Sequence, residues 1–132
     1  MTIEDGGKLV NPMVVDGQIL GGLAQGIGTA LFEEMPFDAL AQPLASTLAD
    51  YLLPGSTDVP ITRIEHIETL APHTEFGVKG IGEGGAIAAP AAIANAVNDA
   101  LRPLRAELLV SPITPHRVLE AIERGHSSRN TP

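Results

Sequence analysis

The stretch that decides the fold is Gly77-Val78-Lys79-Gly80-Ile81-Gly82-Glu83-Gly84-Gly85. It contains five glycines, one cation and one carboxylate, and an alanine-rich segment follows it. Glycine is favoured where the backbone needs a positive φ or must approach another group closely, although so many glycines cost conformational entropy. Two interpretations are open: a long flexible loop, or a backbone wrapped against a ligand with Glu83 at its tip.

Residues 80–85 match the dinucleotide pattern G-x-G-x-x-G, but that pattern needs a hydrophobic strand directly before it, and residues 74–79 do not provide one. A glycine loop that enters a helix still suits an anion such as a phosphate. Lys79 could contact that phosphate or face solvent. Glu83 either lies favourably near a positive helix end or acts as a general base, and enclosure by glycine backbone and apolar helices would raise its pKa.

Composition favours one folded domain, or a piece of a larger one, over 132 residues with 44% apolar and 3% aromatic content. The net charge is −8 and the eight basic residues are dispersed, which argues against nucleic acid as a partner. The absence of cysteine excludes disulfides and iron–sulfur ligation by this chain. No long apolar run predicts membrane insertion and the acidic start does not resemble a secretory signal, so we expect a cytoplasmic location.

A long helix is predicted from Pro12 to about Glu34, with Asn11 as its N-cap and Pro36 limiting its extension. Its glycines each cost about 0.5–1 kcal/mol relative to alanine, so tertiary packing must stabilise it. One broad face is apolar, and it consists of Ile19, Leu20, Leu23, Ala24, Ile27, Ala30 and Leu31. A second face carries Gly17, Gly21 and Gly28, beside a polar edge of Gln18 and Gln25. That face predicts close approach either by another helix or by a ligand.

The remaining elements are predicted to be short. A turn at residues 5–8 suggests a hairpin between residues 1–4 and 8–10, and residues 36–62 should be irregular, with one helical turn or strand at 46–53. Strands are expected at 61–70 and 104–109, and helices at 90–101 and 116–124. Gly125 should stop the last helix, which leaves a disordered tail over residues 125–132.

Together, these stretches resemble the C-terminal part of the large subunit of the molybdenum hydroxylases, the xanthine oxidase and aldehyde oxidase family. The closest resemblance is to its aerobic carbon monoxide dehydrogenase branch. The resemblance covers about residues 4–123 in order and spacing. It rests on Asn11-Pro12, Val15-Asp16-Gly17-Gln18, residues 21–28, Asp50-Tyr51-Leu52-Leu53-Pro54, residues 77–85, Pro90-Ala91, residues 95–101 and Ile113-Thr114-Pro115.

The resemblance implies an α+β fragment of a molybdopterin-binding domain over residues 1–124, with a glycine-rich buried helix, short strands and two C-terminal helices. Glu83 would be the general base at the molybdenum. The residues that would contact the cofactor are Gln25, Gly26, Lys79, Gly80, Gly82, Gly84 and Gly85. The cofactor would be a molybdenum-pterin, in its molybdopterin cytosine dinucleotide form. No residue of this chain is expected to ligate the metal, because its four histidines lack ligand spacing.

The departure from the family is length, because the family's large subunit is several times longer. Partners are therefore expected: the remainder of a large subunit, together with flavin and iron–sulfur subunits that carry FAD and 2Fe–2S clusters. Three accounts are open: a split subunit that completes an active site with a partner, a remnant without activity, or a binding or assembly module that reuses the fold. An exposed apolar patch would favour the first two accounts, and a closed polar surface the third.

Overall fold

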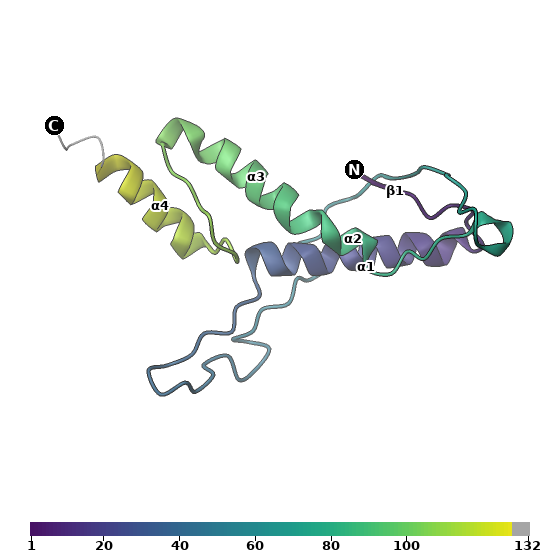
Figure 1. The fold of residues 1–132 in the computed structure, drawn as a ribbon. Helices are drawn as coiled ribbons and strands as arrows, with labels where there is room; N and C mark the ends of the chain where they lie inside the picture. Colours follow the sequence, from purple (N-terminus) through teal and green to yellow (C-terminus); the bar gives the residue numbers. More distant parts are fainter. Residues whose placement is uncertain (128–132) are drawn as a thin grey trace.

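The computed structural model describes residues 1–127 and shows an α+β arrangement built along one long helix (Figure 1). The strands are β1 (Thr2–Glu4) and β2 (Ile64–His66). The helices are α1 (Pro12–Leu31), α2 (Gly84–Ile87), α3 (Ala89–Leu101) and α4 (Pro115–Ser127), with 3-10 turns at Glu75–Gly77 and Arg102–Leu104. The one-turn α2 lies on α1, and α3 then rises away from it toward α4 (Figure 1).

Helix α1 begins as the sequence predicts. The Asn11 side chain accepts a hydrogen bond from the N–H of Val14 at 3.3 Å, and Pro12 occupies the first turn. The helix ends at Leu31 rather than Glu34, because the N–H groups of Phe32 and Glu33 both bond to the carbonyl of Gly28. The predicted apolar face is only partly covered: Ile19, Ile27 and Ala30 are buried, whereas Leu20 is 39% exposed.

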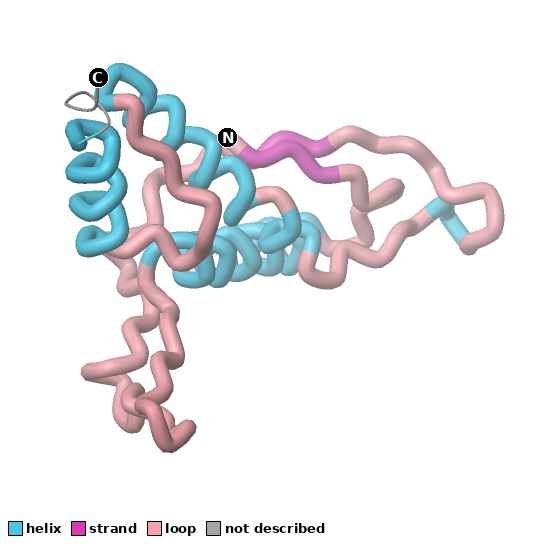
Figure 2. Tube along the Cα trace, turned by 60° about the vertical axis from the view of Figure 1, so that its left-hand side comes forward, coloured by secondary structure: helices cyan, strands magenta, loops and turns pink. Residues whose placement is uncertain are grey.

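The predicted hairpin at the N-terminus is wrong. Strand β1 pairs instead in parallel with β2, with Thr2 opposite Ile64 and Glu4 opposite His66 (Figure 2). Residues 8–10 form no strand, because the chain after β1 turns toward the glycine stretch, where the N–H of Lys79 donates to the carbonyl of Gly6 at 3.0 Å. The strand predicted at 61–70 shrinks accordingly to the three residues that β1 can pair with.

A second packed region joins α3, α4 and the segment between them. Its buried side chains are Leu101, Ala106, Leu108, Ile113 and Ala121. The strand predicted at 104–109 is wrong. Its alternation would turn Leu104, Ala106 and Leu108 inward, and of these Ala106 and Leu108 are buried, whereas Leu104 is 38% exposed. The side chain of Asn98 takes the place of a strand partner: its Nδ2 donates to the carbonyl of Leu108 at 2.9 Å, and its Oδ1 accepts the N–H of the same residue at 2.8 Å.

Helix α4 is longer than the sequence predicts and includes Gly125, His126 and Ser127. The predicted tail at 125–132 thus begins inside a helix, and residues 128–132 lie outside the described residues. Gly125 is buried, and a Cβ there would lie 2.6 Å from the carbonyl oxygen of Leu104. This glycine therefore permits close packing rather than stopping the helix.

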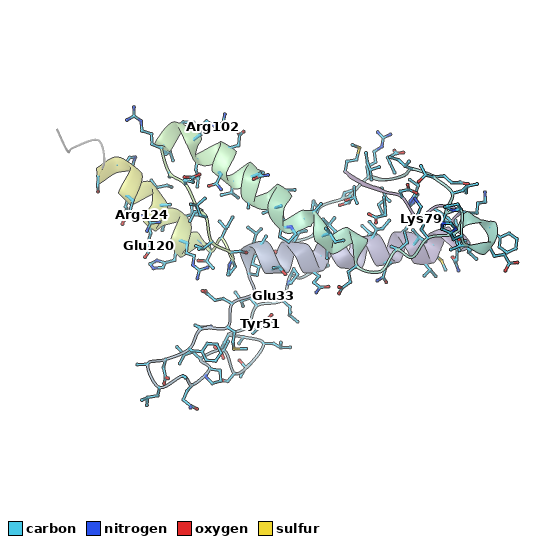
Figure 3. All side chains as sticks on the ribbon, in the orientation of Figure 1. Glu33, Tyr51, Lys79, Arg102, Glu120 and Arg124 are labelled. Atoms are coloured by element: carbon cyan, nitrogen blue, oxygen red, sulfur yellow. The ribbon has the colours of Figure 1, made fainter. Side chains whose placement is uncertain are left out.

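Residues 32–62 leave the body as an irregular arm, as the prolines predict (Figures 1 and 2). Tyr51 ties the arm to the end of α1, because its hydroxyl donates to Oε2 of Glu33 at 2.6 Å (Figure 3). This hydrogen bond to a carboxylate raises the pKa of Tyr51. The arm itself contains one helical turn, closed by the N–H of Tyr51 and the carbonyl of Thr47. Its apolar side chains remain mostly exposed, with Leu40 at 81%.

Candidate functional site

The second half of the glycine stretch packs against the rest of the chain. A Cβ on Gly85 would overlap the main-chain carbonyl of Ile19 in α1, and one on Gly84 would overlap the carboxylate of Glu4 in β1. On α1, Gly22 faces the backbone of Gly85 and Ala86, and a Cβ there would lie 2.9 Å from the nitrogen of Ala86. Glycine is required at Gly22 and Gly85 because two backbones approach each other directly there, whereas the neighbour of Gly84 is the end of a side chain.

The middle of the stretch, at Gly80 and Gly82, is different. A Cβ built on Gly80 or Gly82 would have no heavy atom within 4 Å in the described residues, and the same holds for Gly17 and Gly21 on α1. Only Gly82 among these four has a left-handed backbone, with φ of +52°. The close packing inside this chain therefore does not account for glycine at positions 17, 21 and 80.

Glu83 occupies the tip of a tight turn. The N–H of Gly84 donates to the carbonyl of Ile81 at 3.0 Å, so Gly82 and Glu83 are the two central residues of the turn. Glu83 is also the residue directly before α2, and its side chain makes no capping hydrogen bond. The predicted enclosure of Glu83 is not found within residues 1–127: the side chain is exposed, because this chain covers only the α1 side of the turn.

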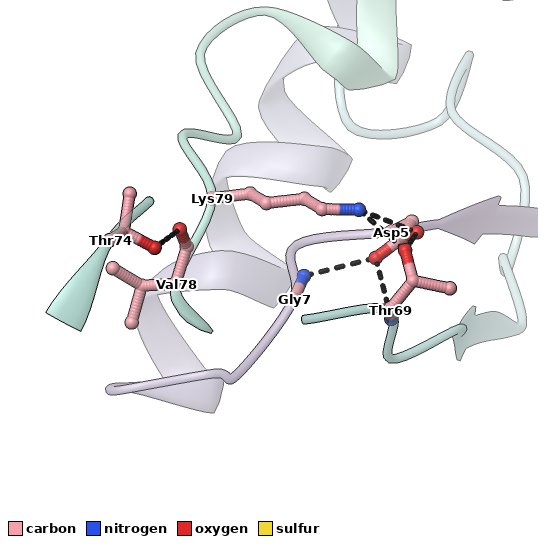
Figure 4. Close-up of polar contacts among 6 residues, drawn as sticks. All are labelled: Asp5, Gly7, Thr69, Thr74, Val78 and Lys79. Atoms are coloured by element: carbon pink, nitrogen blue, oxygen red, sulfur yellow. Dashed lines mark hydrogen bonds and ion pairs between the residues drawn. The ribbon is translucent and has the colours of Figure 1, made fainter. Parts of the chain in front are cut away.

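Lys79 has a role that the sequence did not indicate. Its Nζ donates to Oδ2 of Asp5 at 2.9 Å and also to the hydroxyl of Thr69 (Figure 4). Oδ1 of Asp5 accepts the N–H of Gly7 at 3.0 Å and that of Thr69 at 3.2 Å. The Thr69 hydroxyl, and after it Lys79, hold the pKa of Asp5 well below its usual range. Lys79 therefore joins the start of the glycine stretch to β1 and to the chain after β2, instead of facing solvent.

On α1, the structure separates the residues predicted to approach the cofactor. Gln25 is exposed, whereas Gly26 is buried against Ala89 and Pro90, where a Cβ would lie 2.5 Å and 3.2 Å from their side chains. The face that α2 and α3 approach closely is thus Gly22 and Gly26, not the predicted face of Gly17, Gly21 and Gly28. The helix–helix alternative is therefore wrong for Gly17 and Gly21, and the ligand alternative stays a prediction. Several glycine faces coexist on this helix, and spacing alone does not say which one another helix covers.

Gln18 is a residue whose part in the site the sequence analysis missed. Its Nε2 donates to the carbonyl of Gly82 at 2.7 Å, which links α1 to the turn that carries Glu83. Gln25 lies seven residues further along α1, on the same exposed edge because a helix repeats every 3.6 residues. The signal that could have indicated this role of Gln18 was its place, with Gln25, on the polar edge of the helix beside the glycines.

Within residues 1–127, no group of three or more His, Cys, Asp or Glu side chains is arranged to hold a metal ion. None of the helices in this part of the chain is long and apolar enough to cross a membrane. The site is therefore a surface of glycine backbone, amide side chains and one exposed carboxylate, and it can supply hydrogen bonds and a proton acceptor.

Comparisons with known proteins identify the family of the chain. The family model described as a molybdopterin cofactor-binding domain matches residues 1–60. The chain is 49% identical to quinoline 2-oxidoreductase from Pseudomonas putida 86, whose crystal structure superposes with a TM-score of 0.89 over 92% of this chain and 15% of that one. These matches define the class of protein: a molybdopterin-binding oxidoreductase fold.

Two curated relatives narrow the class. The chain is 46% identical to the nicotine 6-hydroxylase large subunit of Paenarthrobacter nicotinovorans, over 91% of this chain and 15% of the relative. It is 36% identical to the carbon monoxide dehydrogenase large chain of Hydrogenophaga pseudoflava, over 92% of this chain and 15% of the relative. The chain thus belongs to the molybdenum hydroxylase large-subunit family, corresponds to the C-terminal portion of such subunits, and spans 15% of these relatives' length.

Proposed function

We propose that this chain provides the general base, Glu83, and one glycine-lined wall of the cofactor site in a molybdenum hydroxylase. The observation that carries the proposal is a set of glycines that no contact within residues 1–127 requires: a Cβ at Gly17, Gly21 or Gly80 would meet open space there. Glycine in the interior of a helix is destabilising, so its presence at two such positions of α1 favours close approach by a group outside the chain.

The residues present fit a polar, bulky pterin. Gln25 offers an exposed amide, and the turn at residues 80–83 offers main-chain groups without a Cβ in front of Gly80 and Gly82. Gly26, Gly84 and Gly85 would act indirectly, because their packing against α3, β1 and α1 holds this surface in place. Lys79 would do the same through Asp5. The cytosine dinucleotide form remains our proposal for the cofactor.

When bound, the cofactor supplies the oxidation–reduction chemistry of a molybdenum centre. Glu83 contributes a carboxylate at the tip of a turn, near Gly80 and Gly82, which leave room for the reacting group. An exposed carboxylate in this chain becomes enclosed once further polypeptide covers the open side of the turn, and it can then accept a proton from the reacting group. The substrates proposed for the assembled enzyme are aldehydes, N-heterocycles or small CO-like molecules.

The surface of the chain supports a partner. Large apolar side chains stand exposed on several sides of it: Val10 is 81% exposed, and Met13 and Ile87 are each 79% exposed. Ile87 lies on α2, one turn after Glu83. Such side chains favour a surface that packs against more protein, which supports the accounts of a split subunit or a remnant over a self-contained binding module. The relatives are named as large subunits, and we propose flavin and iron–sulfur subunits as the further partners.

The test is a tagged pull-down of the chain from its native host, with molybdenum measured on the eluate. We expect about one molybdenum per chain, together with larger partner chains. A lone chain without metal would contradict the proposal and favour a remnant or a repurposed fold.

In the recovered complex, Glu83→Gln should abolish hydroxylation while leaving the molybdenum content unchanged, because the amide cannot accept the proton. Glu75→Gln is the matched control, since Glu75 is another exposed carboxylate of the segment before α2. Unchanged turnover in the Glu83→Gln complex would overturn the assignment of the base.

A further inference from the structure

A side chain from α1 reaches the turn that presents Glu83. Nε2 of Gln18 donates to the carbonyl oxygen of Gly82 at 2.7 Å, across 64 positions of sequence. The peptide group that is held in this way joins Gly82 to Glu83. It is the central peptide of the turn that the N–H of Gly84 and the carbonyl of Ile81 close at 3.0 Å.

The turn by itself leaves the orientation of this central peptide open. Turns closed by the same hydrogen bond fall into types that differ in how their central peptide is rotated. Glycine at the first central position adopts either sign of φ readily, and Gly82 has a φ of +52° with no heavy atom of the described residues within 4 Å of the position that a Cβ would take. Because the peptide plane sets φ of the next residue, its rotation decides where the Glu83 side chain points, and Glu83 makes no capping bond of its own.

We propose that Gln18 is the positioning residue for Glu83: its amide fixes the Gly82–Glu83 peptide and so aims the carboxylate. The inference rests on the proposed function only for the consequence in catalysis. The contact itself belongs to this chain and can be tested without a cofactor.

The first test measures amide hydrogen exchange of residues 80–85 in the purified chain. Gln18→Met keeps the length of the side chain but removes the donor, so we expect exchange in this stretch to become about 2- to 12-fold faster. Exchange in α4 should remain unchanged. Gln25→Met is the matched control, because Gln25 lies on the same edge of α1 and makes no hydrogen bond to the turn among the described contacts. Equal exchange in wild type and Gln18→Met would overturn the inference.

A second variant tests the donor itself. In Gln18→Glu the ionised carboxylate cannot donate to the Gly82 carbonyl, whereas the protonated carboxyl can. Relative to wild type at the same pH, the turn should therefore exchange faster at pH 7 and regain its protection at about pH 3.5, below the ordinary glutamate pKa. Faster exchange at both pH values would show that the hydrogen bond is not what holds the turn.

The assembled enzyme provides the readout for catalysis. Gln18→Met should lower kcat about 10- to 100-fold with KM little changed, because the base is misaimed while the substrate site is intact. Normal kcat together with faster exchange would contradict the positioning role. This outcome is distinct from failure of the proposed function, which would appear as full activity of Glu83→Gln whatever Gln18→Met does.

Discussion

Six glycines of α1 and of the glycine stretch fall into two regions that look alike in sequence and differ in structure. In the packed region, Gly22 and Gly85 let α1 and α2 touch backbone to backbone, and Gly26 makes room for the side chains of Ala89 and Pro90. In the open region, a Cβ at Gly17, Gly21 or Gly80 would have no neighbour within 4 Å among the described residues. The first group explains how this chain folds, and the second group only makes sense if something outside the described chain comes close. The predictions below test that division.

The largest effect is expected at Gly85. In Gly85→Ala the new Cβ meets the main-chain carbonyl of Ile19, which cannot move without displacing α1. Forcing such a contact typically costs about 1–3 kcal/mol, so the free energy of unfolding should fall by about that amount in urea titrations. Gly80→Ala is the control from the open region, and it should change the stability of the free chain far less. Similar losses in both variants would remove the distinction between the regions.

A smaller effect of opposite sign is expected on the open face of α1. Gly17→Ala and Gly21→Ala should each raise the free energy of unfolding of the free chain by about 0.5–1 kcal/mol, because alanine favours the helix and meets no neighbour. The same variants should lower the molybdenum content of the assembled complex, since the methyl group would occupy space proposed for the cofactor. A stabilised chain with full molybdenum content would show that these glycines do not face the cofactor.

Sequence reasoning recovered the elements that local chemistry specifies. The start of α1 follows from Asn11 and Pro12, and the helical identity of α3 and α4 follows from their proline starts and apolar spacing. The family resemblance, which rests on ordered motifs, is confirmed by the comparisons. It also assigned Glu83 and Gln25 to the site, which remain predictions.

What the sequence could not supply was long-range pairing. The partner of β1 lies 62 positions away in β2, while the local pattern favoured a hairpin with residues 8–10. The segment at 104–109 alternates like a strand, but the main chain of Leu108 pairs with the Asn98 side chain and not with another strand. Lys79 was judged from its glycine neighbours, and nothing nearby in sequence indicated Asp5 as its partner. Each error concerns a contact between residues that are separated in sequence. The local pattern around one residue of such a pair does not indicate which residue will be its partner.

The smallest expected effect concerns the start of the glycine stretch, which Lys79 holds through its contact with Asp5 (Figure 4). The pKa of Asp5 is depressed in the folded chain, because the Thr69 hydroxyl and Lys79 favour its ionised form. A depressed carboxyl pKa contributes stability that is fully present above the unfolded pKa of about 3.9 and is lost as the pH falls toward the folded value. Acid should therefore loosen residues 77–82 below about pH 4, while the packed glycines keep α2 against α1.

Hydrogen exchange at a series of pH values, corrected for intrinsic rates, measures this difference between residues 77–82 and α3. In Asp5→Asn the stretch should already be loosened at pH 7, and the step below pH 4 should disappear, because position 5 no longer titrates. Glu68→Gln is the control, since Glu68 is paired only loosely with Lys8 at 3.6 Å and both side chains are more than half exposed. If Asp5→Asn keeps the acid step, another carboxylate anchors the open region. The Lys79 contact would then be incidental to how Glu83 is presented.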